Sequence, residues 1–137
     1  MSCQVVEFNG RRYAEIIRAD ARVETTVFFS PAASSMQFGL LAHRAGFVEP
    51  PHFHPSTNRS IIDLQQMFVV QRGVVAVDFF DDAGHALGEV VLEAGDAILL
   101  VEGAHSVRAL ADMQCISVKQ GPFLGVENDK VELVSRA

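Results

Sequence analysis

Two histidines that could bind a metal ion stand near the middle of the chain, in the stretch His52-Phe53-His54 after two prolines. Side chains of an extended segment alternate between its two faces, so His52 and His54 should present their imidazoles on the same side. Neutral ring nitrogens at this spacing suit a transition-metal ion. A third histidine, His105, lies far downstream, and the fold must return it to the pair for a three-histidine site. The alternative interpretation is a pair of loop histidines beside a Pro-Pro turn.

The composition predicts one folded domain over residues 1–137, since the chain is 49% hydrophobic and 20% charged. Its net charge of −6 and lack of a basic cluster argue against nucleic-acid and anionic-membrane partners. No apolar run approaches the ~20 residues of a membrane span. The first residues lack the features of a signal peptide, and Cys3 and Cys115 form no disulfide framework. We therefore expect a cytoplasmic protein with reduced thiols.

Short strands and turns account for most of the sequence. Glycine and aspartate separate the apolar segments at roughly 8–12-residue intervals, which is typical of an antiparallel β-sandwich or barrel. The pair Asn9-Gly10 favours a tight hairpin between the first two strands. The expected strands cover residues 5–8, 13–17, 23–29, 36–43, 66–72, 74–80, 86–92, 97–101 and 113–119.

Two of these strands, 67–70 and 97–101, are apolar on both faces. An antiparallel sheet usually turns one face to water, so its strands should alternate between apolar and polar residues. The outer face of these strands should therefore be covered as well. Either the chain's own hairpins or a second subunit could cover it, and we favour a homodimer.

Two short motifs in the chain resemble those of the cupin superfamily, which are small jelly-roll barrels. The first motif consists of Gly46, His52, His54, Gln66 and Gly73, and the second of Gly95, Asp96, Gly103 and His105. The chain is similar to a subgroup of small bacterial cupins without a settled function. The resemblance implies an all-β, antiparallel double-stranded β-helix or jelly-roll barrel with its core at about residues 13–120.

The resemblance also implies a metal site. His52, His54 and His105 would bind one divalent transition metal ion, namely Fe, Ni, Zn, Cu or Mn, with Gln66 in the position where the family usually has glutamate. An amide oxygen offers a dipole but no charge, so ions that prefer imidazole should be retained better than manganese. Because Gln66 cannot take a proton at neutral pH, any acid–base step needs another group.

Three other residues are candidates for contact with a small ligand. Arg59 lies in the long loop 55–65, where its guanidinium could bind an anion or simply be exposed. Phe68 shares strand parity with Gln66, so it should point into the same cavity. Lys119 ends the last strand and could line the mouth of the barrel.

We expect a metal-binding protein that acts on, or binds, a small oxygen-rich molecule such as a sugar derivative or an organic acid. As an enzyme it would catalyse an isomerase-like or dioxygenase-like reaction at a three-histidine ion. The main alternative is a non-catalytic ligand-binding or accessory protein in which loss of the glutamate has ended catalysis. A third possibility is a metal-free epimerase-like barrel, which needs an acid and a base, although Tyr13 is the only tyrosine. Fold alone does not choose between them.

Overall fold

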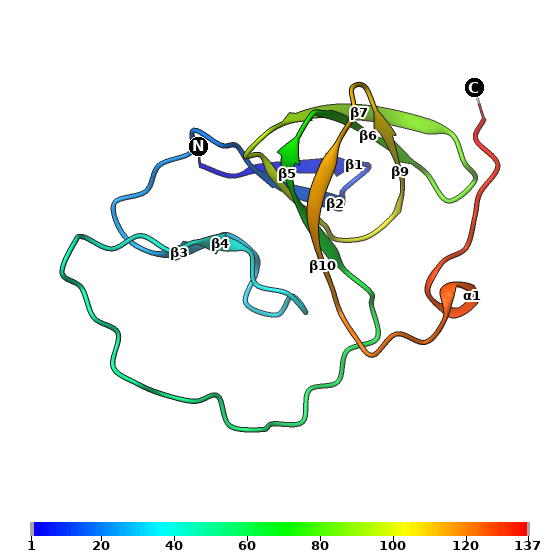
Figure 1. Cartoon of the computed structure of the whole chain (residues 1–137). Coiled ribbons are helices and arrows are strands. Elements are labelled where there is room, and N and C mark those ends of the chain that lie inside the picture. Colours follow the sequence, from blue (N-terminus) through cyan, green and yellow to red (C-terminus); the bar gives the residue numbers. More distant parts are fainter. Residues whose placement is uncertain (1, 137) are drawn as a thin grey trace.

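The computed structural model describes residues 2–136 as an all-β chain with antiparallel sheets and one short helix (Figure 1). The larger sheet has the strand order β1-β2-β8-β5-β10, the smaller one β7-β6-β9, and β3 pairs only with β4. Within these residues no helix is long and apolar enough to cross a membrane. The elements are β1 (Gln4–Phe8), β2 (Arg11–Ile17), β3 (Val27–Phe28), β4 (Gly39–Leu40), β5 (Gln66–Arg72), β6 (Val74–Phe80), β7 (Ala86–Glu93), β8 (Ala97–Leu100), β9 (Ala104–Ala109), β10 (Gln114–Lys119) and α1 (Val126–Asp129).

The two larger sheets do not close into the barrel expected from the sequence. Across the described residues, β9 pairs only with β6 and β10 pairs only with β5, so each is a free edge. Residues 41–64, which we call the arm, join no sheet. The arm leaves β4 and returns to β5 as one wide, open loop on the side of the molecule away from the C-terminus (Figure 1).

The core lies between the two larger sheets, where alternate side chains of β5 and β6 meet. Phe68 and Val70 belong to the same buried cluster as Val75, Val77 and Phe79, and each of the five is at most 5% exposed. Burying one such side chain contributes about 1.5–3 kcal/mol. The cluster therefore holds the two sheets face to face.

The strands with strong local signals form where the sequence predicts them. β5 and β6 have the predicted bounds, and the β1–β2 turn has positive φ angles at Asn9 (54°) and Gly10 (75°). In contrast, the predicted strands 23–29 and 36–43 shrink to the two-residue strands β3 and β4. β9 is a strand that the sequence analysis does not predict.

The segment around Phe38 forms a partial outer layer on the larger sheet instead of a long strand. Phe38 packs with Ile17 and Leu99 in a second buried cluster. The Ser30 hydroxyl donates to the Glu15 carboxylate at 2.7 Å and accepts from the Phe38 amide at 2.9 Å. The chain's own segment thus covers part of the outer face, which is one of the two possibilities left open by the sequence.

Asp96, in the turn between β7 and β8, fastens that turn to the end of β2. Its carboxylate accepts hydrogen bonds from the Glu93 amide (2.8 Å), the Ala19 amide (2.8 Å) and the Arg18 guanidinium (3.1 Å). Burial opposes ionisation of this side chain, but the two amides and Arg18 outweigh that effect and lower the pKa of Asp96.

We predict that Asp96→Asn lowers the free energy of unfolding by about 2–3 kcal/mol at pH 7, because hydrogen bonds to a buried charge are lost. The lowered pKa means that the unfolded chain takes up the proton first as pH falls. The stabilisation that the ionised Asp96 side chain gives the fold is therefore fully present above pH ~4. It disappears as pH falls through the pKa of Asp96 in the folded state. Urea unfolding at pH 7 and pH 3 measures both effects. The control Asp82→Asn, whose side chain is 80% exposed, should change stability by less than ~0.5 kcal/mol. Equal stability of Asp96→Asn and the parent at pH 7 would contradict the assignment.

Candidate functional site

A cleft of about 1120 Å³ runs along β9, between that strand and the C-terminal tail, residues 121–136. The tail is held near the β6–β7 turn, where the Arg136 amide donates to the Gly84 carbonyl at 2.7 Å. The cleft reaches the ends of β5, β8 and β10 at the mouth of the space between the sheets. Polar or aromatic groups on its wall include Gln66, His105, Ser106, Lys119, Phe123 and Lys130.

Gln66 is the first residue of β5 and pairs in register with Lys119 of β10. Its side-chain amide nitrogen donates to the Ser117 hydroxyl at 2.8 Å. Within residues 2–136 the Gln66 Oε1 atom has no hydrogen-bond partner. This carbonyl oxygen is the atom that a metal ion or a ligand hydroxyl would contact.

His105 lies on β9 opposite Phe79 of β6. Its ring is reached by solvent, but surrounding protein atoms disfavour the imidazolium, and the charge of Lys130 adds to that effect. Both causes lower the pKa of His105, the crowding more than the lysine. At neutral pH the ring is therefore neutral and keeps a nitrogen lone pair for a metal ion or a hydrogen bond.

Two of the three cations on the cleft wall form no ion pair among the described residues, although four carboxylates also line the cleft. Lys119 and Lys130 form no ion pair within residues 2–136, and the Lys119 ammonium lies 5.7 Å from the centre of the Phe123 ring. Arg108, in contrast, is held by Asp78 at 2.6 Å and Glu89 at 2.6 Å. The free lysines are thus the groups available to a small anion.

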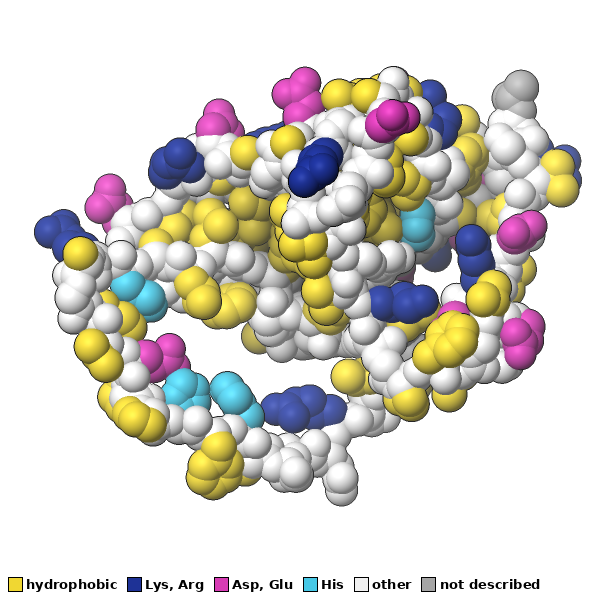
Figure 2. Space-filling model, in the orientation of Figure 1, with side chains coloured by type: hydrophobic (Ala, Val, Ile, Leu, Met, Phe, Trp, Pro, Cys, Tyr) yellow, Lys and Arg dark blue, Asp and Glu magenta, His cyan; other side chains and the backbone are white. Residues whose placement is uncertain are grey.

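His52 and His54 lie on the arm, away from this cleft. Their ring centres are 5.2 Å apart, so the two imidazoles are neighbours. His52 contacts the Glu49 carboxylate through Nε2 (3.1 Å) and the Pro50 carbonyl through Nδ1 (2.9 Å). Figure 2 shows the arm, with its histidines, standing clear of the body of the molecule.

The structure divides the predicted site residues into two groups. Gln66, His105 and Lys119 line the cleft. His52, His54 and Arg59 stand on the exposed arm, and Phe68 is buried in the core without lining the cleft. No three His, Cys, Asp or Glu side chains among residues 2–136 come together as a possible metal site.

Lys130 is a cleft residue that the sequence analysis does not identify. It lies just after α1 in a tail whose position depends on the backbone contact with Gly84. Nothing local in the sequence indicates that contact. β9 does carry a usable signal, because His105 and Val107 alternate with Ser106 and Arg108, the pattern of a two-sided strand.

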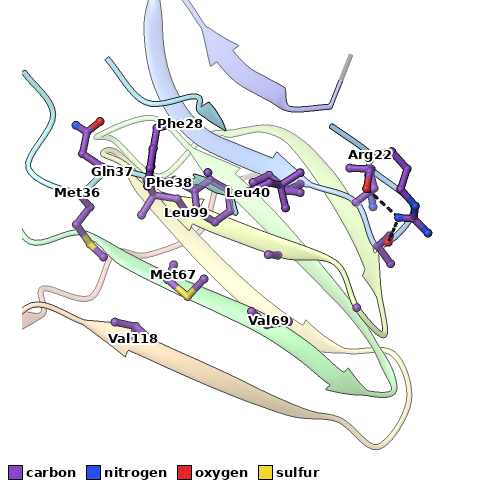
Figure 3. Close-up of a pocket in the computed structure, with 17 residues that line it drawn as sticks. Arg22, Phe28, Met36, Gln37, Phe38, Leu40, Met67, Val69, Leu99 and Val118 are labelled. Atoms are coloured by element: carbon purple, nitrogen blue, oxygen red, sulfur yellow. Dashed lines mark hydrogen bonds between the residues drawn. The ribbon is translucent and has the colours of Figure 1, made fainter. Parts of the chain in front are cut away.

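A second groove, of about 660 Å³, lies on the outer face of the larger sheet (Figure 3). Met67, Val69 and Val118 form its floor, and the labelled side chains of Met36 and Phe38 stand at its upper side. The lining is mainly apolar and lacks histidine and carboxylate groups. This groove therefore has no groups for acid–base chemistry.

Neither cysteine is an activated nucleophile. Burial raises the pKa of the Cys115 thiol, and burial together with the nearby Glu15 charge raises the pKa of the Cys3 thiol.

Comparison of the chain with family models, with curated proteins and with solved structures gave no significant match.

We predict that the His105 ring in metal-free protein titrates below the ordinary histidine value of about 6.5. Substitution Lys130→Gln removes the nearby positive charge and should raise the titration midpoint of His105 part of the way back. NMR titration of the ring protons measures both. The control Lys119→Gln removes a different cleft lysine and should leave the midpoint within error. A His105 midpoint at or above 6.5 in the parent would contradict the crowded environment.

Proposed function

We propose that this chain is a small cupin-type protein that binds, or acts on, a small oxygen-rich anion in the cleft beside His105. A sugar acid or an organic acid is the class of ligand that fits. One observation carries the proposal: the Gln66 Oε1 atom, the neutral His105 ring and two lysines without an ion pair all line the same cleft. The lysines supply charge to carboxylate oxygens, and the histidine and amide supply directed polar contacts to hydroxyl groups.

The same residues support half of a metal site. Gln66 and His105 would hold a divalent ion from the cleft side, and His52 and His54 would complete the set if the arm came to β9. Among residues 2–136 the His52–His54 pair lies apart from Gln66 and His105, so the full set exists only once the arm moves to β9. When bound, a divalent ion would act as a Lewis acid on the oxygens of the ligand.

The second candidate function is binding of the anion without a reaction, and the identity of residue 66 favours it. The Gln66 amide cannot accept a proton at neutral pH, and β5 has no carboxylate in its place, because the acids of the cleft wall stand on other elements. A protein that binds the anion without converting it would need only the lysines, His105 and the Gln66 oxygen. Turnover of a candidate ligand separates the two functions.

We predict that protein purified without chelator contains near-stoichiometric transition metal, and that His105→Ala loses most of it. The lost imidazole is one of three nitrogen ligands, so affinity should fall by at least about tenfold, or ~1.4 kcal/mol. Elemental analysis measures the content. His85→Ala is the matched control, because that histidine lies in a turn beside Asp81 and should leave the content unchanged. Parent protein without metal would contradict the metal part of the proposal.

We predict that Gln66→Glu tightens metal binding by about tenfold or more, with the largest gain for Mn²⁺. The added carboxylate supplies a negative charge that the amide lacks, and Mn²⁺ prefers charged oxygen ligands. Titration calorimetry with Mn²⁺ and Ni²⁺ measures the shift. Gln71→Glu makes the same change in charge at the other end of β5, and should not alter either affinity. An unchanged Mn²⁺ affinity in Gln66→Glu would exclude this position as a ligand.

A further inference from the structure

The groove of about 660 Å³ on the outer face of the larger sheet is separate from the cleft beside β9 (Figure 3). Side chains alternate along β5, so Met67 and Val69 line the groove, whereas Gln66 lines the cleft and Phe68 is buried in the core. Val118 of β10 pairs with Met67 and lines the same groove. The groove and the cleft share no lining residue among those described. A molecule in the groove would therefore leave the cleft free.

The inside of the groove is apolar. Its floor and its upper side are formed by side chains of methionine, valine and phenylalanine (Figure 3). Two of these side chains still meet water, Phe28 (52% exposed) and Val118 (49% exposed). Covering such surface with an apolar ligand is favourable in proportion to the area removed from water. These side chains offer no strong hydrogen-bonding group, so a peptide backbone would lose its hydrogen bonds to water there. The groove thus favours hydrocarbon over a polar chain.

Positive charge lies at one end of the groove, where the turn after β2 carries Arg18 and Arg22. Figure 3 shows Arg22 at one side of the groove and Met36 at the other. The Arg18 guanidinium is paired with the buried Asp96 carboxylate at 3.1 Å. Arg22 forms no ion pair within residues 2–136, and no described carboxylate lines the groove. Arg22 is thus the charge that the groove offers to a ligand.

The Arg22 guanidinium is oriented by the backbone of its own turn. Its NH1 group donates to the Ala19 carbonyl at 3.3 Å and to the Ala21 carbonyl at 2.8 Å. Nε and NH2 form no hydrogen bond within the described part of the chain. The N–H groups of this free edge form a planar fork, which matches the two oxygens of a carboxylate. The end of the groove is therefore suited to a carboxylate group.

The size of the groove fits a small molecule better than a protein. Small-molecule sites usually have volumes of about 300–1,000 Å³. A stable protein interface needs roughly 800 Å² from each partner. Two copies of this chain would also bring together net charges of −6 each. A hydrocarbon body with one negative end matches both the floor of the groove and Arg22.

We propose that the groove binds the anion of a medium-chain fatty acid. The alkyl chain would lie on Met67, Val69 and Val118, and the carboxylate would accept hydrogen bonds from Nε and NH2 of Arg22. This ligand lacks the hydroxyl groups of the sugar acid or organic acid proposed for the cleft. The two sites are therefore independent, and the groove site does not rest on the function proposed for the cleft.

Titration calorimetry with decanoate, octanoate and 1-decanol tests the ligand class. Decanoate should bind about tenfold more tightly than octanoate, because two more methylene groups leave water. Arg22→Gln should weaken decanoate binding by at least about tenfold and leave 1-decanol binding within about twofold, since only the carboxylate needs the fork. Arg22 is exposed, so the variant should fold. The control Arg72→Gln removes an exposed cation from the other end of β5 and should leave decanoate binding unchanged. A parent that binds no decanoate, or equal binding by Arg22→Gln, overturns the proposal.

NMR of methyl-labelled methionines tests the location. Met36 and Met67 line the groove, whereas Met113 lies outside it and is 37% exposed. Decanoate should shift the methyl signals of Met36 and Met67 and leave that of Met113 in place. Saturable binding that shifts neither groove methionine would put the fatty acid elsewhere and overturn the site. Light scattering separates a further occupant, because a dimer formed through this face that decanoate does not dissociate would also overturn it.

Discussion

The contact between β5 and β6 across the core sets the positions of Gln66 and His105 in the cleft. Phe68 and Val70 meet Val75, Val77 and Phe79, so the parity of both strands is fixed by burial. A shift by one residue would turn these apolar side chains to solvent. The same parity directs Gln66, two residues before Phe68, toward the space between the sheets, and places His105 opposite Phe79. The polar groups of the cleft thus owe their positions to apolar packing.

The parts of the fold that can be predicted from the sequence are those with local causes. Asn9 and Gly10 provide the positive φ angles of a tight turn, and the apolar runs of β5 and β6 have the length and composition of buried strands. The long strand predicted around Phe38 is wrong because the position of this segment depends on distant partners. The chain of hydrogen bonds from Glu15 through Ser30 to Phe38 joins residues far apart in sequence. No local pattern indicates that such a segment will lie across a sheet and not within it.

The candidate site is predictable to a similar degree. The His-x-His spacing predicts that the rings of His52 and His54 lie close together, and they do. The alternation of side chains along β5 places Gln66 at the cleft. Neither rule says which sheet edge an extended segment will join, because strand pairing depends on backbone groups that all residues share. For that reason the three-histidine ligand set stays a prediction from the sequence, and the His52–His54 pair and His105 remain separate among the described residues.

The anchoring of the arm by a few hydrogen bonds at its ends, such as those from Ala42 to Thr26 and from Ser35 to Asp63, has a consequence for the energetics of folding. Since the arm joins no sheet and its side chains are exposed along almost its whole length, the body can fold to its final packing without it. The conformational entropy of these residues is therefore not lost when the body folds. Any contact that orders the arm must offset that entropy from its own interaction energy.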